Sequence, residues 1–170
     1  MLDGFQILVF PGGFSYGDDV AAGKILANQT VHHLSDILNQ FIENGKLVLG
    51  ICNGFQVLMK SGVILPEDKS KGAAATLTWN DSGKFEDRWV YLRVDGSQCV
   101  FLKAVEQLYL PVAHAEGKFV TRDRPAFDWL DVQGQLVLRY VSQTGGGNGQ
   151  VHYPDNPNGS MGHVAGICDH

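Results

Sequence analysis

The sequence predicts an α/β domain in which helices flank a mostly parallel sheet, with a partly antiparallel excursion. Two observations predict the parallel part: short apolar runs that end in turns, and apolar residues at helical spacing between those runs. A later series of strand-like segments, without a strong helical repeat between them, predicts the excursion. The chain has 170 residues and is 44% apolar, which is enough for one core. We therefore expect a single domain over residues 1–170.

The first third of the chain alternates strand and helix patterns. Gln6–Phe10 is an apolar run closed by Pro-Gly-Gly, which is typical of a buried strand before a turn. Apolar residues then recur at helical spacing across 34–42, and Gly45 follows where a helix cap belongs. Lys46–Ile51 is a second buried strand candidate, and Phe55–Lys60 begins a new helix. This order favours parallel strands joined by helical crossovers.

The rest of the chain is richer in strand signals than in helix signals. A glycine-rich run at residues 144–149 predicts a flexible surface loop. The predicted later strands are Thr76–Trp79, Trp89–Val94, Gln107–Ala113, Leu136–Val141 and His163–Cys168.

Composition excludes several classes of function. The formal net charge is -5 without a basic stripe, so nucleic acid is not an expected partner. No apolar run approaches the roughly 18 residues of a membrane span, and the N-terminus does not read as a signal peptide. Cys52, Cys99 and Cys168 are an odd number and far apart in sequence, which argues against a disulfide framework and suits a reducing cytoplasm. The histidines show no metal-ligand spacing with them, so we expect no metal site.

The strongest candidate for chemistry is Cys52, which occupies a sharp turn between a predicted buried strand and a helix. Such a turn exposes the side chain at the carboxyl end of the strand, and the helix dipole there favours the thiolate. Gly50 and Gly54 bracket the cysteine and allow the cramped backbone of a nucleophile elbow. The alternative is that Cys52 is a small buried hydrophobe, as we expect for Cys99 and Cys168.

The turn after the first strand is a second candidate, because acyl transfer needs two donors aimed at the developing oxyanion. We expect the backbone N–H of Gly13 to be one donor and that of Asn53, directly after the nucleophile, to be the other. Alone, a Pro-Gly-Gly turn is also compatible with a plain loop.

Five blocks in register resemble the glutaminase subunit or domain of phosphoribosylformylglycinamidine synthase, a triad glutamine amidotransferase. The blocks are FPGGFSYGDD, LGICNGFQVL, SGKFEDRWVYLRV, VAHAEGKF and YPDNPNGS, and together they cover nearly the whole chain. The resemblance implies a class I glutamine amidotransferase-like, flavodoxin-like fold.

The resemblance also implies a reaction. Cys52 would attack the side-chain amide of glutamine, release ammonia, and leave a glutamyl thioester that water hydrolyses. By the same analogy Gln56 would contact the glutamine, and the segment from Ser82 to Phe85 would close over it. No cofactor is expected in this domain. A separate synthase subunit would bind ATP and Mg²⁺ and use the ammonia to make the amidine in purine biosynthesis, and a small bridging subunit is a further candidate partner.

The sequence departs from the family pattern in its proton-transfer residues. The family's His-Pro-Glu, which supplies a base and its orienting acid, occurs nowhere in this chain, and His170 is not followed by Pro-Glu. We therefore expect truncation at the C-terminus. We also expect it at the N-terminus, because Met1 stands only a few residues before a strand that the family places after an opening βαβ segment. His114 and Glu116 have the same His-x-Glu spacing but belong to the VAHAEGKF block. A structural role is expected for them, with functional substitution as the alternative if both project from one side of a strand.

Two other functions compete with an active glutaminase. A non-catalytic module of the same fold would keep glutamine binding or subunit docking without hydrolysis. A different activity on a cysteine elbow, as in α/β hydrolases, is the third hypothesis, and the SGKFEDRWV block counts against it.

Overall fold

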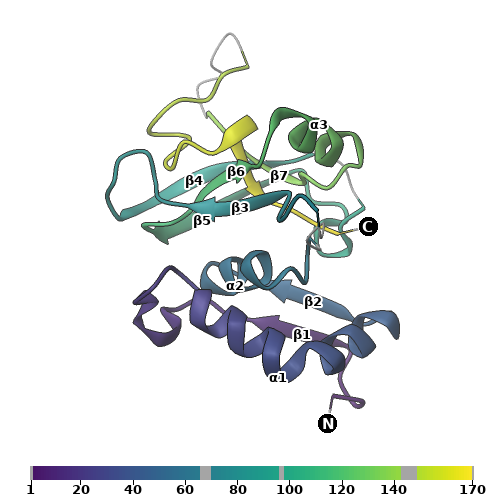
Figure 1. The fold of residues 1–170 in the computed structure, drawn as a ribbon. Helices are drawn as coiled ribbons and strands as arrows, with labels where there is room; N and C mark the ends of the chain where they lie inside the picture. The colour runs from purple at the N-terminus through teal and green to yellow at the C-terminus, as the bar shows by residue number, and fades with distance from the viewer. Residues whose placement is uncertain (1, 66–69, 96–97, 143–148, 170) are drawn as a thin grey trace. The chain divides into compact units, whose positions relative to one another are not determined.

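The computed structural model describes residues 2–65, 70–95, 98–142 and 149–169. The chain divides into two compact units, Met1–Pro66 and Glu67–His170 (Figure 1). The expectation of a single domain stays a prediction. The predicted glycine-rich loop lies outside the described residues, except for Gly149.

The first unit has the predicted alternation of strands and helices. Its two strands pair in parallel, with Phe10 opposite Gly50. The second helix contacts both strands and also the first helix. The long helix begins ten residues before the apolar repeat that predicted it, and Gly45 follows its end at φ 71°. The elements are β1 (Ile7–Phe10), the 3-10 turn η1 (Ser15–Asp18), α1 (Lys24–Glu43), β2 (Leu47–Gly50) and α2 (Asn53–Ser61).

The prediction that these two strands are buried is wrong: no residue of either strand is fully buried, and one face of β1 is exposed. Ile7 and Val9 project from the same face and remain 49% and 46% exposed, whereas the alternate residues Leu8 and Phe10 are more covered. The described strands of this unit form a sheet of two, so few neighbouring strands or helices are available to cover both faces. The apolar run therefore identified the strand but not its environment.

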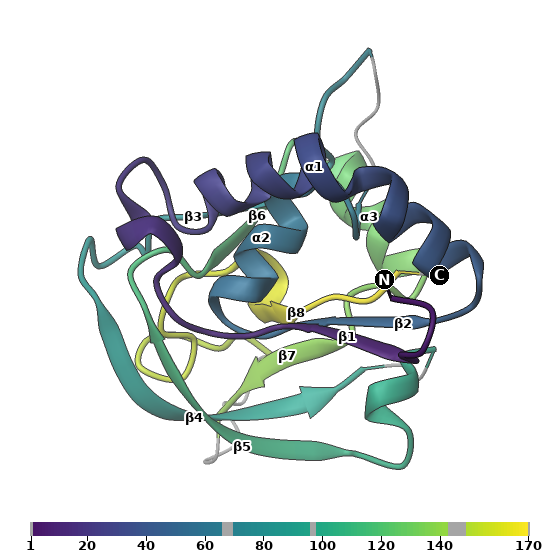
Figure 2. The same cartoon turned by 90° about the horizontal axis from the view of Figure 1, so that it is seen from below.

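The second unit is built mainly from antiparallel strands (Figure 2). One sheet pairs β3 with β6, and the other has the order β5-β4-β7-β8. The elements are β3 (Ala75–Thr78), β4 (Glu86–Val94), η2 (Val100–Leu102), β5 (Gln107–His114), β6 (Lys118–Thr121), α3 (Arg124–Val132), β7 (Leu138–Val141), η3 (Met161–His163) and β8 (Val164–Gly166).

The chain is α/β, but the expected mostly parallel sheet is not what the described residues show. Among them, β1 and β2 form the only parallel pair, and the remaining ladders are antiparallel. Parallel neighbours require a long crossover, and α1 supplies one between β1 and β2. In the second unit every described pair is antiparallel, as where β4 pairs with both β5 and β7, and the antiparallel part is larger than expected.

Helix α3 and strand β6 were not predicted. The helix nevertheless has a readable start, because the Asp123 side chain accepts a hydrogen bond of 2.8 Å from the Ala126 N–H and Pro125 lies in the first turn. Phe127 and Leu130 are buried on one side of it. Only Ala126, Phe127 and Leu130 are buried along the helix, so its apolar repeat is short in the sequence.

The four-stranded sheet carries an apolar cluster on one face, formed by Val90, Leu92 and Tyr140. Burial raises the pKa of the Tyr140 phenol to about 12. Among the described residues, no helix combines the length and apolar character that a membrane span requires.

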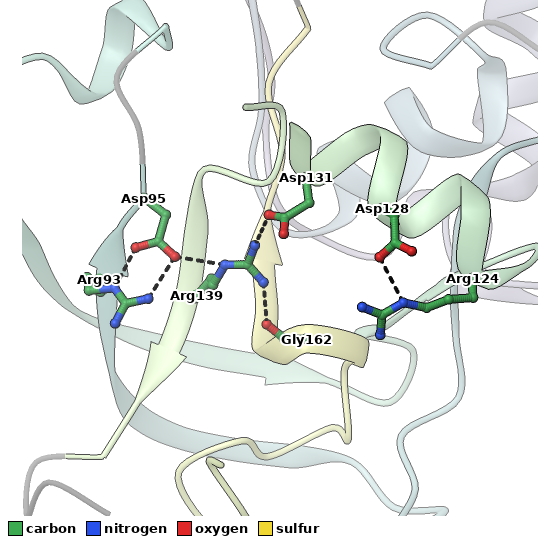
Figure 3. A network of polar contacts seen from close by, with 7 residues as sticks. All are labelled: Arg93, Asp95, Arg124, Asp128, Asp131, Arg139 and Gly162. Atoms are coloured by element: carbon green, nitrogen blue, oxygen red, sulfur yellow. Dashed lines mark hydrogen bonds and ion pairs between the residues drawn. The ribbon is translucent and has the colours of Figure 1, made fainter. Parts of the chain in front are cut away.

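Arg139 joins three elements of the second unit (Figure 3). Its guanidinium donates to Gly162 O at 2.6 Å, to Asp131 at 2.5 Å and to Asp95 at 2.8 Å. Arg93 binds the same Asp95 carboxylate, and mainly this hydrogen bond lowers the pKa of Asp95 below its ordinary value. The network holds β7, α3, η3 and the end of β4 together.

Candidate active site

Cys52 lies on the predicted elbow between β2 and α2. Its backbone has φ 53° and ψ -112°, a positive φ that non-glycine residues rarely adopt. Such a conformation costs on the order of 1–3 kcal/mol and is typical of functional positions. The side chain is exposed, so the alternative of a buried packing cysteine is not supported by the geometry.

The two bracketing glycines are needed because β1, β2 and α2 approach each other closely. A Cβ on Gly54 would lie 1.9 Å from the Phe10 carbonyl oxygen. A Cβ on Gly50 would lie 2.6 Å from Leu58 Cδ1 and 2.8 Å from the Gly54 carbonyl oxygen. Any side chain at either position would push the helix away from the strands, and the elbow would lose its geometry.

The Gly12-Gly13 turn lies against the nucleophile. The Ile51 N–H donates to Phe10 O at 3.0 Å, which continues the pairing of β1 with β2 up to the turn. A Cβ built on Gly12 would lie 3.3 Å from Cys52 Cβ and 4.0 Å from its Sγ. Gly13 has φ 138° and open space around it, so its requirement for glycine is conformational. The oxyanion roles of Gly13 and Asn53 stay predictions.

The Asn53 side chain connects the elbow to the loop that follows β1. It is only 3% exposed, and its oxygen accepts a hydrogen bond of 3.2 Å from the Ser15 N–H. Its nitrogen donates to Asp18 Oδ1 at 3.1 Å and to Gln56 Oε1 at 3.0 Å. Asp18 Oδ1 also accepts from the Gly23 N–H at 3.1 Å. The residue after the nucleophile is thus tied to both ends of the loop.

Gln56 is buried, with 5% of its surface exposed, and its side-chain oxygen accepts a hydrogen bond from Asn53. A contact between Gln56 and substrate glutamine stays a prediction. What the structure shows is the hydrogen bond from Asn53 to the Gln56 side chain. Asp18 was missed by the sequence reasoning. Its only signal was its place inside the FPGGFSYGDD block.

Ser82 and Phe85 belong to the second unit, whereas Cys52 belongs to the first. Ser82 is exposed and accepts a hydrogen bond of 3.3 Å from the Lys84 N–H, and Phe85 is 49% exposed. Gly83 turns the chain between them at φ 64°. The assignment of Ser82 and Phe85 to substrate binding stays a prediction.

Asn80 anchors the base of the 81–85 turn. Its nitrogen donates to Lys84 O at 2.9 Å and to His114 O at 2.8 Å, and its oxygen accepts from the Gly117 N–H at 3.1 Å. The side chain is 3% exposed. One buried amide therefore joins the SGKF turn to the turn of the HAEGKF block.

Asn158 anchors the same region from the NPNGS block. The side chain is fully buried, donates to Gly117 O at 2.8 Å and to the Tyr140 hydroxyl at 3.0 Å, and accepts from the Ser160 N–H at 3.0 Å. Its own carbonyl accepts from the Asp81 N–H at 3.1 Å. The three sequence blocks of the second unit therefore meet in one hydrogen-bonded cluster, which was not foreseen from the sequence.

The alternative in which His114 and Glu116 project from one side of a strand does not fit the structure. Strand β5 ends at His114, and Glu116 lies in the turn that leads into β6, a strand of the other sheet. His114 Nδ1 lies 3.2 Å from Asn80 Oδ1, and a Cβ on Gly117 would lie 2.3 Å from the imidazole. Burial lowers the pKa of His114. These contacts favour the structural role, and His170 lies outside the described residues.

The other two cysteines are placed as packing residues. Cys99 is buried and Cys168 is half-buried. Burial raises the pKa of the Cys168 thiol to about 12, and the neighbouring Cys99 acts in the same direction. Cys168 is therefore protonated at neutral pH and is a poor nucleophile.

Comparison with known proteins agrees with this geometry. The family described as CobB/CobQ-like glutamine amidotransferase domain matches residues 1–170. Phosphoribosylformylglycinamidine synthase subunit PurQ of Dehalococcoides mccartyi is 47% identical over 168 residues, which are 97% of this chain and 62% of that protein. The same subunit of Methanococcus maripaludis strain C5 is 42% identical, over 97% of this chain and 61% of that protein.

A solved structure of PurLQS from Thermotoga maritima is similar to this chain with a TM-score of 0.71 and 31% identity. The match covers 99% of this chain and 65% of that one. The chain thus spans less than two thirds of the length of these relatives. The family match extends over all 170 residues and includes the cysteine elbow with its glycine turn, and on that basis the chain belongs to the CobB/CobQ-like glutamine amidotransferase domain family.

Proposed function

We propose that this chain is the glutaminase part of a phosphoribosylformylglycinamidine synthase, with Cys52 as its nucleophile. The observation that carries the proposal is the strained, exposed Cys52 elbow with Gly12 packed against it, in a chain of the amidotransferase family. A PurQ relative of 47% identity supports the purine-pathway assignment. The flavodoxin-like arrangement of the family is part of the proposal.

The reaction begins when the Cys52 sulfur attacks the side-chain carbonyl carbon of glutamine. The carbonyl oxygen becomes negative, and the N–H groups of Gly13 and Asn53 stabilise it. The C–N bond then breaks, the nitrogen takes a proton and leaves as ammonia, and a glutamyl thioester remains. Water hydrolyses the thioester to glutamate and restores the thiol.

Substrate binding in this proposal involves Gln56, Ser82 and Phe85. The proton transfers need a base and an acid, and we assign neither role to a residue of this chain. His114 is not assigned, because Asn80 and Gly117 hold its ring within the second unit.

The ammonia would pass to a synthase partner that binds ATP and Mg²⁺, and no cofactor is proposed for this chain. The names of the relatives support a partner, since they are synthase subunits and one solved relative is the PurLQS assembly. A small bridging subunit is a further proposed partner. The free cysteines of the described structure suit a cytoplasmic location.

The test is covalent labelling with the chloromethyl ketone analogue of glutamine, in which a chloromethyl group replaces the amide nitrogen. Cys52 displaces chloride and forms a thioether, which mass spectrometry locates. We expect one label on Cys52, protection by excess glutamine, and no label in Cys52→Ala although Cys99 and Cys168 remain. A folded chain whose Cys52 is labelled by iodoacetamide but not by the analogue would refute glutamine recognition.

A further inference from the structure

The loop that carries Gly13 is held in an unusual backbone conformation. Tyr16, Gly17 and Asp18 have φ of 55°, 69° and 55°, so three successive residues lie in the left-handed region. Two of the three are not glycine, and each of these conformations is unfavourable on its own. The conformation therefore persists only because other contacts hold it.

The contacts that hold it converge on Asp18 and Asn53. Asp18 is half-buried, and one of its carboxylate oxygens accepts from both Asn53 Nδ2 and the Gly23 N–H, at 3.1 Å each. Asn53 in turn accepts from the Ser15 N–H at 3.2 Å. Hydrogen bonds at Ser15 and at Asp18 thus attach the loop to the buried side-chain amide of Asn53.

That amide belongs to the first residue of α2. The N–H groups of the first helical turn have no acceptor within the helix, so the Asn53 N–H is suited to donate to a ligand. The other proposed donor, Gly13, lies on the loop that Asp18 closes. The separation between the two donors therefore depends on both attachments of the loop to the Asn53 amide, one at Ser15 and one at Asp18.

We propose that Asp18 is a positioning residue for the oxyanion site, holding the Gly13 turn at a fixed distance from Asn53. The inference rests on the proposed function and adds a residue to it. Asp18 acts through its hydrogen bonds and does not contact the reacting atoms. Without it, Asn53 keeps its place in the helix, whereas the Gly13 turn is released at one of its two attachments.

The experiment measures labelling of Cys52 in the full chain with the chloromethyl ketone analogue of glutamine, whose ketone oxygen takes the place of the amide oxygen. The saturating rate and the half-saturating concentration are determined separately. Iodoacetamide serves as a second probe, because it alkylates a thiol without using an oxyanion site. Far-ultraviolet circular dichroism checks that each variant is folded.

The variants separate geometry from charge. Asp18→Ala removes the acceptor, Asp18→Asn keeps an acceptor oxygen without the charge, and Asp18→Glu keeps the charge but displaces it by one methylene. Asp19→Asn is the matched control, because this neighbouring carboxylate is exposed.

We expect Asp18→Ala and Asp18→Glu to lower the saturating rate with the analogue by about tenfold, with the half-saturating concentration and the iodoacetamide rate unchanged within about twofold. Asp18→Asn should restore most of the rate, and Asp19→Asn should match wild type. If Asp18→Ala does not fold, the Glu and Asn variants carry the test.

Three results would overturn the inference: unchanged labelling in Asp18→Glu, an equal loss with iodoacetamide, or a change in the half-saturating concentration alone. A wild-type chain that the analogue does not label would instead overturn the proposed function, and the inference with it.

Discussion

Replacing Gly54 by alanine tests whether the elbow depends on close backbone packing. The added Cβ would lie 1.9 Å from the Phe10 carbonyl oxygen, 2.4 Å from its carbon and 2.7 Å from Phe10 Cβ. Ordinary carbon-to-oxygen contacts are about 3.3 Å or longer. Helix α2 and strand β1 would have to separate by more than about 1 Å, and neither partner is a flexible side chain.

The expected cost follows from the same atoms. Overpacking costs roughly 1–3 kcal/mol or more, and the carbonyl that must move is also the acceptor for the Ile51 N–H at 3.0 Å. Loss of that hydrogen bond adds about 1 kcal/mol. We expect Gly54→Ala to reduce the free energy of unfolding of the first unit by about 3–4 kcal/mol, a large part of the stability of a small domain.

The assay separates the two units by their spectroscopic signals. Urea unfolding followed by far-ultraviolet circular dichroism reports mainly on α1 and α2, which have 20 and 9 residues, against 9 residues in α3. Tryptophan fluorescence reports on the second unit, because all three tryptophans lie there. Gly54→Ala should lower the urea concentration at the midpoint of the circular-dichroism transition and leave the midpoint of the fluorescence transition unchanged.

Two other glycines are matched controls for Gly54. Gly4 has open space around it and an ordinary φ, so Gly4→Ala should change stability by less than about 0.5 kcal/mol. Gly45 also has open space but a φ of 71°, so Gly45→Ala should cost about 1 kcal/mol through backbone strain alone. If Gly54→Ala costs no more than Gly45→Ala, the steric account of the elbow is refuted.

Three further predictions concern the second unit. Asn158→Ala should lower its free energy of unfolding by about 3 kcal/mol, since it leaves several buried polar groups without partners; a loss under about 1 kcal/mol in urea unfolding by tryptophan fluorescence would contradict this. Arg139→Ala should lower the free energy of unfolding by about 2 kcal/mol, because the Arg139 side chain is only 14% exposed within its network. Arg124→Ala should lower it by less than about 0.5 kcal/mol, because the Arg124–Asp128 pair is exposed (Figure 3). Equal losses in the two variants would refute the distinction. Burial lowers the pKa of His114 in the folded chain, so the unfolded chain binds the proton more readily and stability should fall as pH drops below the ordinary histidine pKa of about 6.5. Urea unfolding at about pH 7.5 and about pH 5.5 should show a smaller difference in His114→Gln, and an unchanged difference would exclude His114 as a source of the pH dependence.

The elbow was predictable because its signal is local. A strand, a cysteine between two glycines and a helix lie within about ten residues, and the close approach that requires the glycines occurs within the same segment and the strand before it. The positions of the strands other than β6 were predictable for the same reason. Their pairing was not, because an apolar run is compatible with a parallel or an antiparallel neighbour. A very short connection excludes a parallel pair, but a long one allows either, and β7 and β8 are antiparallel across a long connection.

The hydrogen-bonded supports of the site were not predictable, because they join residues far apart in sequence. Asn53 and Asp18 are separated by 35 positions, and Asn158 and Gly117 by 41. An asparagine in a loop usually indicates a turn, and nothing in its immediate neighbours shows that its amide is buried. The sequence blocks identified where these residues lie but not which contacts they make.

Both units hold a glycine-containing turn with buried asparagine amides, and the chemistry of the side chain explains the choice. An amide offers donors and an acceptor without charge, so one side chain can satisfy an N–H and a C=O from different segments. Asn80 does this with Gly117 N–H and Lys84 O, and Asn53 joins the Ser15 N–H to Asp18. A carboxylate at these positions would have no donor, and an apolar residue would leave the backbone groups unpaired. The asparagines therefore hold these turns from buried positions while residues 12–14 and 81–85 stay exposed.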